Sequence, residues 1–178
     1  MVLGAYGDRE ATLQTVFHEY THFVMQQNFG TLPTWVNEGV ADFYSTFRSD
    51  YKNGQALVGL APRSRLATIR ERGIMPLERI LTMDGSAALL RDPNGMLAFY
   101  AQSWAFVHYV QLGTDGNRRG QIGAYLKAID QGVPIEQAFN RAFGVTFAQM
   151  QRELTAYVRL PSFPALLFTP KEIGRAHV

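Results

Sequence analysis

Two histidines four residues apart, with a glutamate directly after the first, are the residues best suited to chemistry in this sequence. They lie in the segment His18-Glu19-Tyr20-Thr21-His22. On a helix, this spacing places both imidazoles on one face about one turn apart, so that both can bind a single metal ion. Glu19 lies beside them and can reach a water molecule at that metal. The alternative interpretation is a pair of incidental histidines on an ordinary helix.

A third residue of a suitable type, Glu38, follows sixteen residues after His22 in the segment Trp35-Val36-Asn37-Glu38-Gly39-Val40-Ala41-Asp42. The connection is short enough for this second segment to return antiparallel over the first. Two histidines and one glutamate, with a fourth position open to water, are typical of catalytic rather than structural zinc sites. Asp42 comes one helical turn after Glu38, where it can accept a hydrogen bond from the non-ligating ring nitrogen of His18 or His22. The alternative for Asp42 is an ordinary solvent-facing carboxylate.

The elements that must position these residues are mostly helices. Apolar residues recur at helical spacing over residues 9–30 and again over residues 33–47. Residues 2–5 form a short apolar run that we interpret as the end of a strand leading into the first helix. Residues 49–62 are expected to form a loop with a short extended piece. Further helices are expected at about 63–71, 76–82, 96–112, 119–131, 134–143 and 146–157.

The segments HEYTH and WVNEGVAD resemble the gluzincin clan of zinc metallopeptidases, in which HExxH supplies two ligands and a Glu on the next helix supplies the third. The segment FYAQSWAFVHY at 99–109 is similar to the helix that follows the site in the bacterial peptidase MA-like family. The similarity runs over about residues 13–157. It implies a Zn²⁺ ion held by three ligands, a general base, and a carboxylate that orients a ligand histidine. These roles fall on His18, His22 and Glu38 as ligands, Glu19 as base, and Asp42 as the orienting carboxylate.

The same resemblance implies the fold. In that family a β-sheet precedes HExxH, and only residues 2–5 could represent it here. The expected fold class is therefore mainly α: the helical catalytic part of a zincin-like domain, with most of the N-terminal β-sheet missing or truncated. We expect this domain at residues 1–160, followed by a linker or the start of a further region at 161–171. Residues 172–178 read EIGRAHV, which is typical of a translated sequencing adapter, and are interpreted as a non-native tail.

Tyr100 is the candidate for stabilising the oxyanion that forms during hydrolysis. A phenol hydroxyl can donate a hydrogen bond where negative charge develops, and gluzincins commonly use a Tyr or a His in this role. The alternative is that Tyr100, Trp104 and Val107 form a core stripe at helical spacing. His108 is the second candidate for the oxyanion role, although a lone histidine is more often structural.

These residues together predict hydrolysis of a peptide bond in a peptide or protein substrate. Glu19 would take a proton from a metal-activated water, which attacks the carbonyl carbon, and would pass the proton to the leaving amine. Two other classes stay open: a catalytically inactive zincin-like module that binds peptides, and a helical scaffold without metal. Retention of Glu19 argues against the first, because a structural metal site needs no base. The second leaves the histidines and carboxylates without a common explanation.

Composition sets limits on partners and location. The chain has 178 residues, of which 47% are hydrophobic and 18% charged, as in an ordinary globular domain. Its formal net charge of +2 comes without a long basic run, so nucleic acid is not an expected partner. It contains no cysteine, so a metal must be bound by His, Asp, Glu or backbone oxygen. No segment has the length and apolarity of a membrane span. The sequence leaves the cellular compartment unknown; a leader peptide lost by truncation would make it extracytoplasmic.

Overall fold

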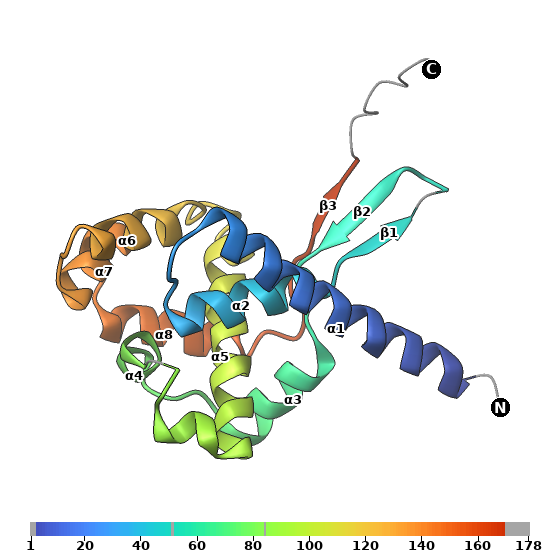
Figure 1. The fold of residues 1–178 in the computed structure, drawn as a ribbon, viewed down its shortest axis with the longest axis horizontal. Coiled ribbons are helices and arrows are strands. Elements are labelled where there is room, and N and C mark those ends of the chain that lie inside the picture. The colour runs from blue at the N-terminus through green and yellow to red at the C-terminus, as the bar shows by residue number, and fades with distance from the viewer. Residues whose placement is uncertain (1–2, 51, 84, 170–178) are drawn as a thin grey trace.

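Helix α5 (Pro93–Leu112) is the element against which the site-bearing helix α2 and helix α3 pack (Figure 1). In this computed structural model, which describes residues 3–50, 52–83 and 85–169, every residue from 101 to 110 is buried. A helix that is buried all round is a core helix rather than an amphipathic surface helix. It begins where the Asp92 side chain accepts a hydrogen bond from the Gly95 N–H, with Pro93 in the first turn.

Helices α1 (Leu3–Asn28) and α2 (Thr34–Ser45) carry the two segments singled out in the sequence. They pack against each other, and α1 crosses over α2 and extends beyond the body of the molecule (Figure 1). The strand expected at residues 2–5 is wrong for the part described, because α1 already includes residues 3–5. A helix satisfies its own backbone hydrogen bonds, whereas a short strand needs a neighbour to pair with.

The close packing of α2 on α5 depends on Gly39. A Cβ atom at this position would lie 2.5 Å from the Ser103 carbonyl oxygen and 2.7 Å from Cγ2 of Val107. Both distances are well inside van der Waals contact, so only glycine permits this approach of the two helices. Glu38 is the preceding residue in α2, and Tyr100 lies one turn before Ser103 in α5. The glycine therefore fixes the separation of the two helices next to the candidate site.

The rest of the chain is also largely helical, which confirms the mainly α fold class. The expected helices are present: α1 begins six residues before the predicted start, and the ends of the other helices are displaced by up to three residues. A 3₁₀ turn, η1, precedes α5 and was not expected. The remaining elements are α3 (Arg63–Arg72), α4 (Leu77–Thr82), η1 (Ala88–Arg91), α6 (Gln121–Asp130), α7 (Ile135–Phe143) and α8 (Phe147–Tyr157).

A small antiparallel sheet lies at the side of the helical body (Figure 1). Its three strands, in the order β1-β2-β3, are β1 (Arg48–Asp50), β2 (Gln55–Val58) and β3 (Leu166–Phe168). Strand β2 is the short extended piece expected within residues 49–62. Strand β3 comes from the stretch expected to be a linker or the start of a further region, and its Leu167 pairs with Leu57. All three strands follow the histidine motif in the sequence, so this sheet is distinct from one that precedes it.

Two further expectations from the sequence concern the C-terminal tail and membrane-spanning segments. The tail interpreted as non-native, residues 172–178, lies outside the described residues. Within the described part, no helix has the length and apolar character needed to cross a membrane.

Candidate metal centre

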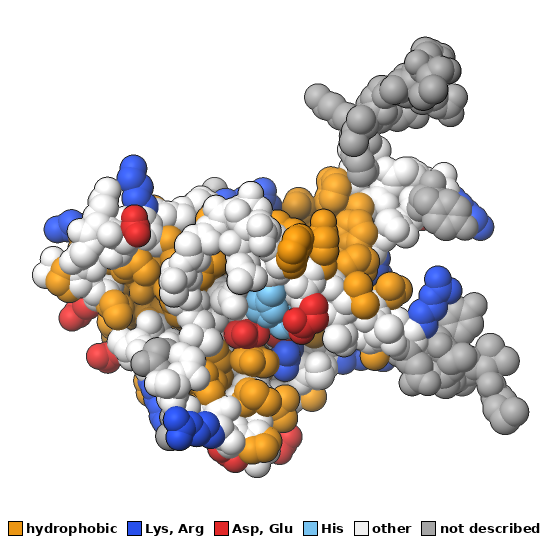
Figure 2. All heavy atoms as spheres, in the orientation of Figure 1, with side chains coloured by type: hydrophobic (Ala, Val, Ile, Leu, Met, Phe, Trp, Pro, Cys, Tyr) orange, Lys and Arg blue, Asp and Glu red, His pale blue; other side chains and the backbone are white. Residues whose placement is uncertain are grey.

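Three side chains from α1 and α2 direct one metal-binding atom each to a common point. Nε2 of His18 lies 3.0 Å from Nε2 of His22. Oε2 of Glu38 lies 3.4 Å from the first of these nitrogens and 3.5 Å from the second. The group consists of the three ligands predicted from the sequence. Histidine side chains reach the surface in the middle of the face shown in Figure 2, with acidic side chains on both sides of them.

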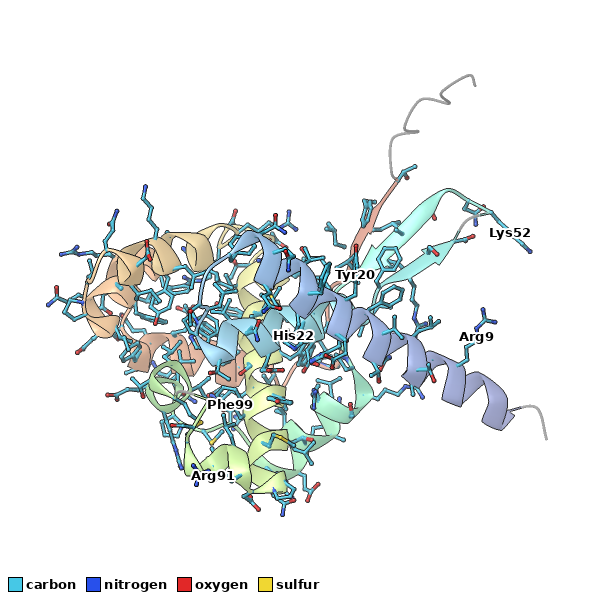
Figure 3. The ribbon with its side chains drawn as sticks, in the orientation of Figure 1. Arg9, Tyr20, His22, Lys52, Arg91 and Phe99 are labelled. Atoms are coloured by element: carbon cyan, nitrogen blue, oxygen red, sulfur yellow. The ribbon has the colours of Figure 1, made fainter. Side chains whose placement is uncertain are left out.

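The size of this triangle fits a tetrahedral zinc ion. Zinc binds imidazole nitrogen and carboxylate oxygen at about 2.0–2.2 Å, which places any two ligands of a tetrahedron about 3.3 Å apart. The three separations in the protein lie close to that value. The helix explains the pairing of the histidines, because residues four apart lie on one face. Figure 3 shows His22 and Tyr20 on different sides of α1.

His18 is oriented by a carboxylate from α2. Its Nδ1 lies 3.1 Å from Oδ1 of Asp42, the contact expected from the spacing of Asp42 and Glu38. This hydrogen bond, followed by that to Glu38, raises the pKa of His18 to about 9, and burial opposes the shift. The metal-free ring is therefore protonated at neutral pH, and a metal bound at Nε2 would have to displace a proton. His22 differs, because its buried Nδ1 has no hydrogen-bond partner among the residues the structure describes.

Asp42 has a second partner that the sequence did not reveal. Arg65, from α3, donates from Nε to Oδ2 of Asp42 at 2.6 Å and from Nη2 to Oδ1 at 3.1 Å. The Asp42 side chain is only 6% exposed, so its charge is compensated inside the protein. No spacing rule links positions 42 and 65, because they lie on helices separated by the β1–β2 hairpin.

Tyr100 lies at the same site. It lines a cavity of about 320 Å³ together with His18, Asp42 and Arg65. The ring is half-buried, and the Arg65 guanidinium lies 5.4 Å from its centroid. Burial raises the pKa of Tyr100, the carboxylates of Glu38, Asp42 and Glu19 add to the rise, and Arg65 opposes it. The phenol is therefore protonated at neutral pH and can donate a hydrogen bond. Trp104 and Val107, the other members of the stripe, are fully buried, so the stripe runs from the cavity into the core.

Glu19 is exposed on α1, next to the predicted ligand His18 in the sequence. Its negative charge contributes to the raised pKa of Tyr100, after burial and the carboxylates of Glu38 and Asp42. A solvent-accessible carboxylate next to a predicted metal ligand is suited to exchange protons with a water molecule or a substrate.

His108 does not belong to the site, which excludes the second oxyanion candidate. It is fully buried, with Nε2 2.7 Å from the Gly59 carbonyl oxygen and Nδ1 2.6 Å from the Tyr157 hydroxyl. A carbonyl only accepts, so Nε2 carries the proton and Nδ1 accepts from the tyrosine. Burial lowers the pKa of His108 to about 4, which keeps the ring neutral. The residue joins α5 to α8 and to the end of the hairpin.

Fold and site together define a mainly helical protein with a cluster of two histidines and one glutamate beside a cavity. The chain belongs to the family described as protein of unknown function (DUF1570), which it matches over residues 12–136. That span contains every residue of the candidate site and ends within the first residues of α7. No curated protein and no solved structure matches the chain.

Proposed function

We propose that this protein is a zinc-dependent hydrolase that cleaves peptide bonds in a peptide or protein substrate, as the gluzincin resemblance implies. The observation that carries the proposal is the convergence of Nε2 of His18, Nε2 of His22 and Oε2 of Glu38 within 3.0–3.5 Å of one another. A zinc ion held by these atoms supplies a Lewis acid that polarises a carbonyl and lowers the pKa of a water molecule.

The chain's own residues account for the remaining steps. His18 is held by Asp42 so that Nε2 faces the other ligand atoms. Glu19 accepts the proton of the attacking water on its carboxylate and returns it to the leaving amine. Tyr100 donates from its hydroxyl to the oxygen of the substrate carbonyl as negative charge develops there. The cavity beside His18 admits the substrate segment next to the bond that is cleaved.

A binding module that keeps the site without turnover is the second candidate from the sequence. It needs neither a base nor an oxyanion donor. Glu19 directly follows His18 on α1, and Tyr100 lines the same cavity as His18, which favours the hydrolase.

Cleavage of a mixed library of internally quenched peptides by the zinc-loaded protein tests the proposal. We expect cleavage that a chelator abolishes and that added zinc restores, and Glu19→Gln should abolish it while leaving the fold intact. Glu10→Gln, which replaces an exposed glutamate nine residues earlier on α1, is the matched control and should keep full activity. Zinc binding without cleavage of any peptide, unchanged by Glu19→Gln, would support the binding module instead.

A further inference from the structure

Arg65 is the residue that links the metal ligands to the rest of the protein. It comes from α3, which packs on α5. Its guanidinium contacts Asp42 on α2 and Tyr100 on α5. Both of its bonds to Asp42 are charge-assisted, at 2.6 and 3.1 Å, and its other neighbour is the ring of Tyr100. Its side chain is only 16% exposed, so the ion pair is largely shielded from solvent.

The two hydrogen bonds from Arg65 compensate the charge of Asp42 and also fix the orientation of its carboxylate. A pair of nearly parallel N–H···O bonds fixes the plane of a carboxylate as well as its position. Oδ2 is occupied by Nε of Arg65, and Oδ1 is shared between Nη2 of Arg65 and Nδ1 of His18. The direction in which Oδ1 meets the imidazole is therefore set by the arginine. Since Asp42 fixes the ring of His18, the orientation of Nε2 depends on Arg65 in turn.

A lysine could supply the same charge but not this geometry. An ammonium group is a point charge on a flexible stem, whereas a guanidinium presents its donors in a rigid fork. Tyr100 adds a further constraint, because its ring lies against the guanidinium and restricts where the fork can lie. One side chain from each of four helices takes part in this arrangement: His18 from α1, Asp42 from α2, Arg65 from α3 and Tyr100 from α5.

We infer that Arg65 is a positioning residue that sets the metal affinity of the site by locking Asp42, and through it His18. This inference rests on the proposed metal site and adds a residue outside both zinc-binding segments. Arg65 does not contact the metal. Its effect is expected on the affinity and the coordination geometry of the bound ion.

The test measures metal binding directly, without a substrate. Zinc affinity is measured by competition with a chromophoric chelator, and the visible spectrum of the cobalt-substituted protein reports the ligand geometry. The variants are Arg65→Met, Arg65→Lys, Asp42→Asn and the double variant Arg65→Met/Asp42→Asn. The matched control is Arg63→Met, an exposed arginine two residues earlier on α3.

We expect Asp42→Asn and Arg65→Met each to weaken zinc binding by about 10- to 100-fold, the range for losing a partner of a ligand histidine. The double variant should lose little more than the larger single effect, because both act through one contact. Arg65→Lys should bind zinc more weakly than wild type and show an altered cobalt spectrum. Arg63→Met should match wild type in both measurements.

Three results distinguish a failure of the inference about Arg65 from a failure of the proposed function. Wild-type affinity and spectrum in Arg65→Met would overturn the inference and leave the metal site intact. If Arg65→Met does not fold, wild-type behaviour of Arg65→Lys overturns it equally, because a lysine cannot reproduce the fork. A folded wild-type protein that binds neither zinc nor cobalt would instead overturn the proposed function, and the inference with it.

Discussion

Glu19 and Glu38 are chemically alike, and the proposed mechanism gives them different roles. Oε2 of Glu38 lies within 3.5 Å of Nε2 of both His18 and His22, whereas Glu19 is exposed and follows His18 in the sequence. Glu38→Gln should therefore weaken zinc binding strongly, while Glu19→Gln should keep the metal and lose turnover. Isothermal titration with zinc and a peptide-cleavage assay on both variants check this. Release of zinc by Glu19→Gln as readily as by Glu38→Gln would show that the roles are wrongly assigned.

Tyr100→Phe removes only the hydroxyl at the cavity. If that hydroxyl donates to the developing oxyanion, kcat should fall by about 100- to 1,000-fold, with zinc content and stability unchanged. Tyr109→Phe on the same helix is the control, because its hydroxyl donates to Glu153 on α8, away from the cavity. An equal loss of activity in both variants, or none in Tyr100→Phe, would contradict the oxyanion role.

The sequence predicted most of the residue-scale arrangement. The i, i+4 spacing of His18 and His22 and the single turn between Glu38 and Asp42 are local features, and a helix converts them directly into geometry. Arg65 could not be predicted, because its contact with Asp42 depends on how α3 packs against α5. The choice between the two oxyanion candidates also could not be made from the sequence. Tyr100 and His108 lie on one helix, and only tertiary packing shows which one faces the cavity.

At the scale of elements, the site depends on how closely α2 approaches α5. Gly39→Ala should lower the free energy of unfolding by about 1–3 kcal/mol, because the new methyl group meets the Ser103 carbonyl at 2.5 Å. Gly123→Ala in α6 is the control, since nothing lies within 4 Å of a Cβ atom there. It should raise the free energy of unfolding by about 0.5–1 kcal/mol. Urea unfolding of both variants measures these free energies. A Gly39→Ala variant as stable as wild type would refute the packing argument.

Helices and strands could be predicted where the apolar pattern extends over many residues, and could not be distinguished where the apolar run is short. The helices follow from apolar spacing sustained over several turns. The run at residues 2–5 is too short to distinguish a strand from the start of a helix, and the structure extends α1 through residues 3–5. Strand β3 was missed because its pairing partner, β2, is more than a hundred residues away in the sequence. Such long-range pairing leaves no local pattern.

At the scale of the whole molecule, His108 makes stability depend on pH. Its folded pKa of about 4 lies below the unfolded value of 6.5, so on acidification the unfolded chain binds a proton that the folded chain does not. Stability is therefore lost as the pH falls from about 6.5 to about 4, by on the order of 3 kcal/mol from this residue. His18 has the opposite shift, to about 9, so its contribution changes above pH 6.5 and does not overlap with this range.

His108→Gln isolates this contribution, because a glutamine can bond to both Gly59 and Tyr157 but does not titrate in this range. Denaturant unfolding in the presence of a chelator, at pH 7 and pH 4.5, should show a smaller acid-induced loss in the variant than in wild type. Groups that titrate in both proteins cancel in this difference. Equal losses in the two proteins would mean that His108 is not held neutral.

The central claim is that His18, His22 and Glu38 form one zinc site, and metal stoichiometry tests it most directly. The protein is stripped with a chelator, dialysed against zinc, freed of excess metal and analysed by elemental mass spectrometry. The account predicts about one zinc per chain in wild type and in Glu10→Gln, and close to none in His22→Ala. A higher melting temperature with zinc than with chelator should accompany binding, since the ion joins α1 to α2. A folded wild-type protein without zinc, or a His22→Ala variant that retains a full equivalent, would contradict the account.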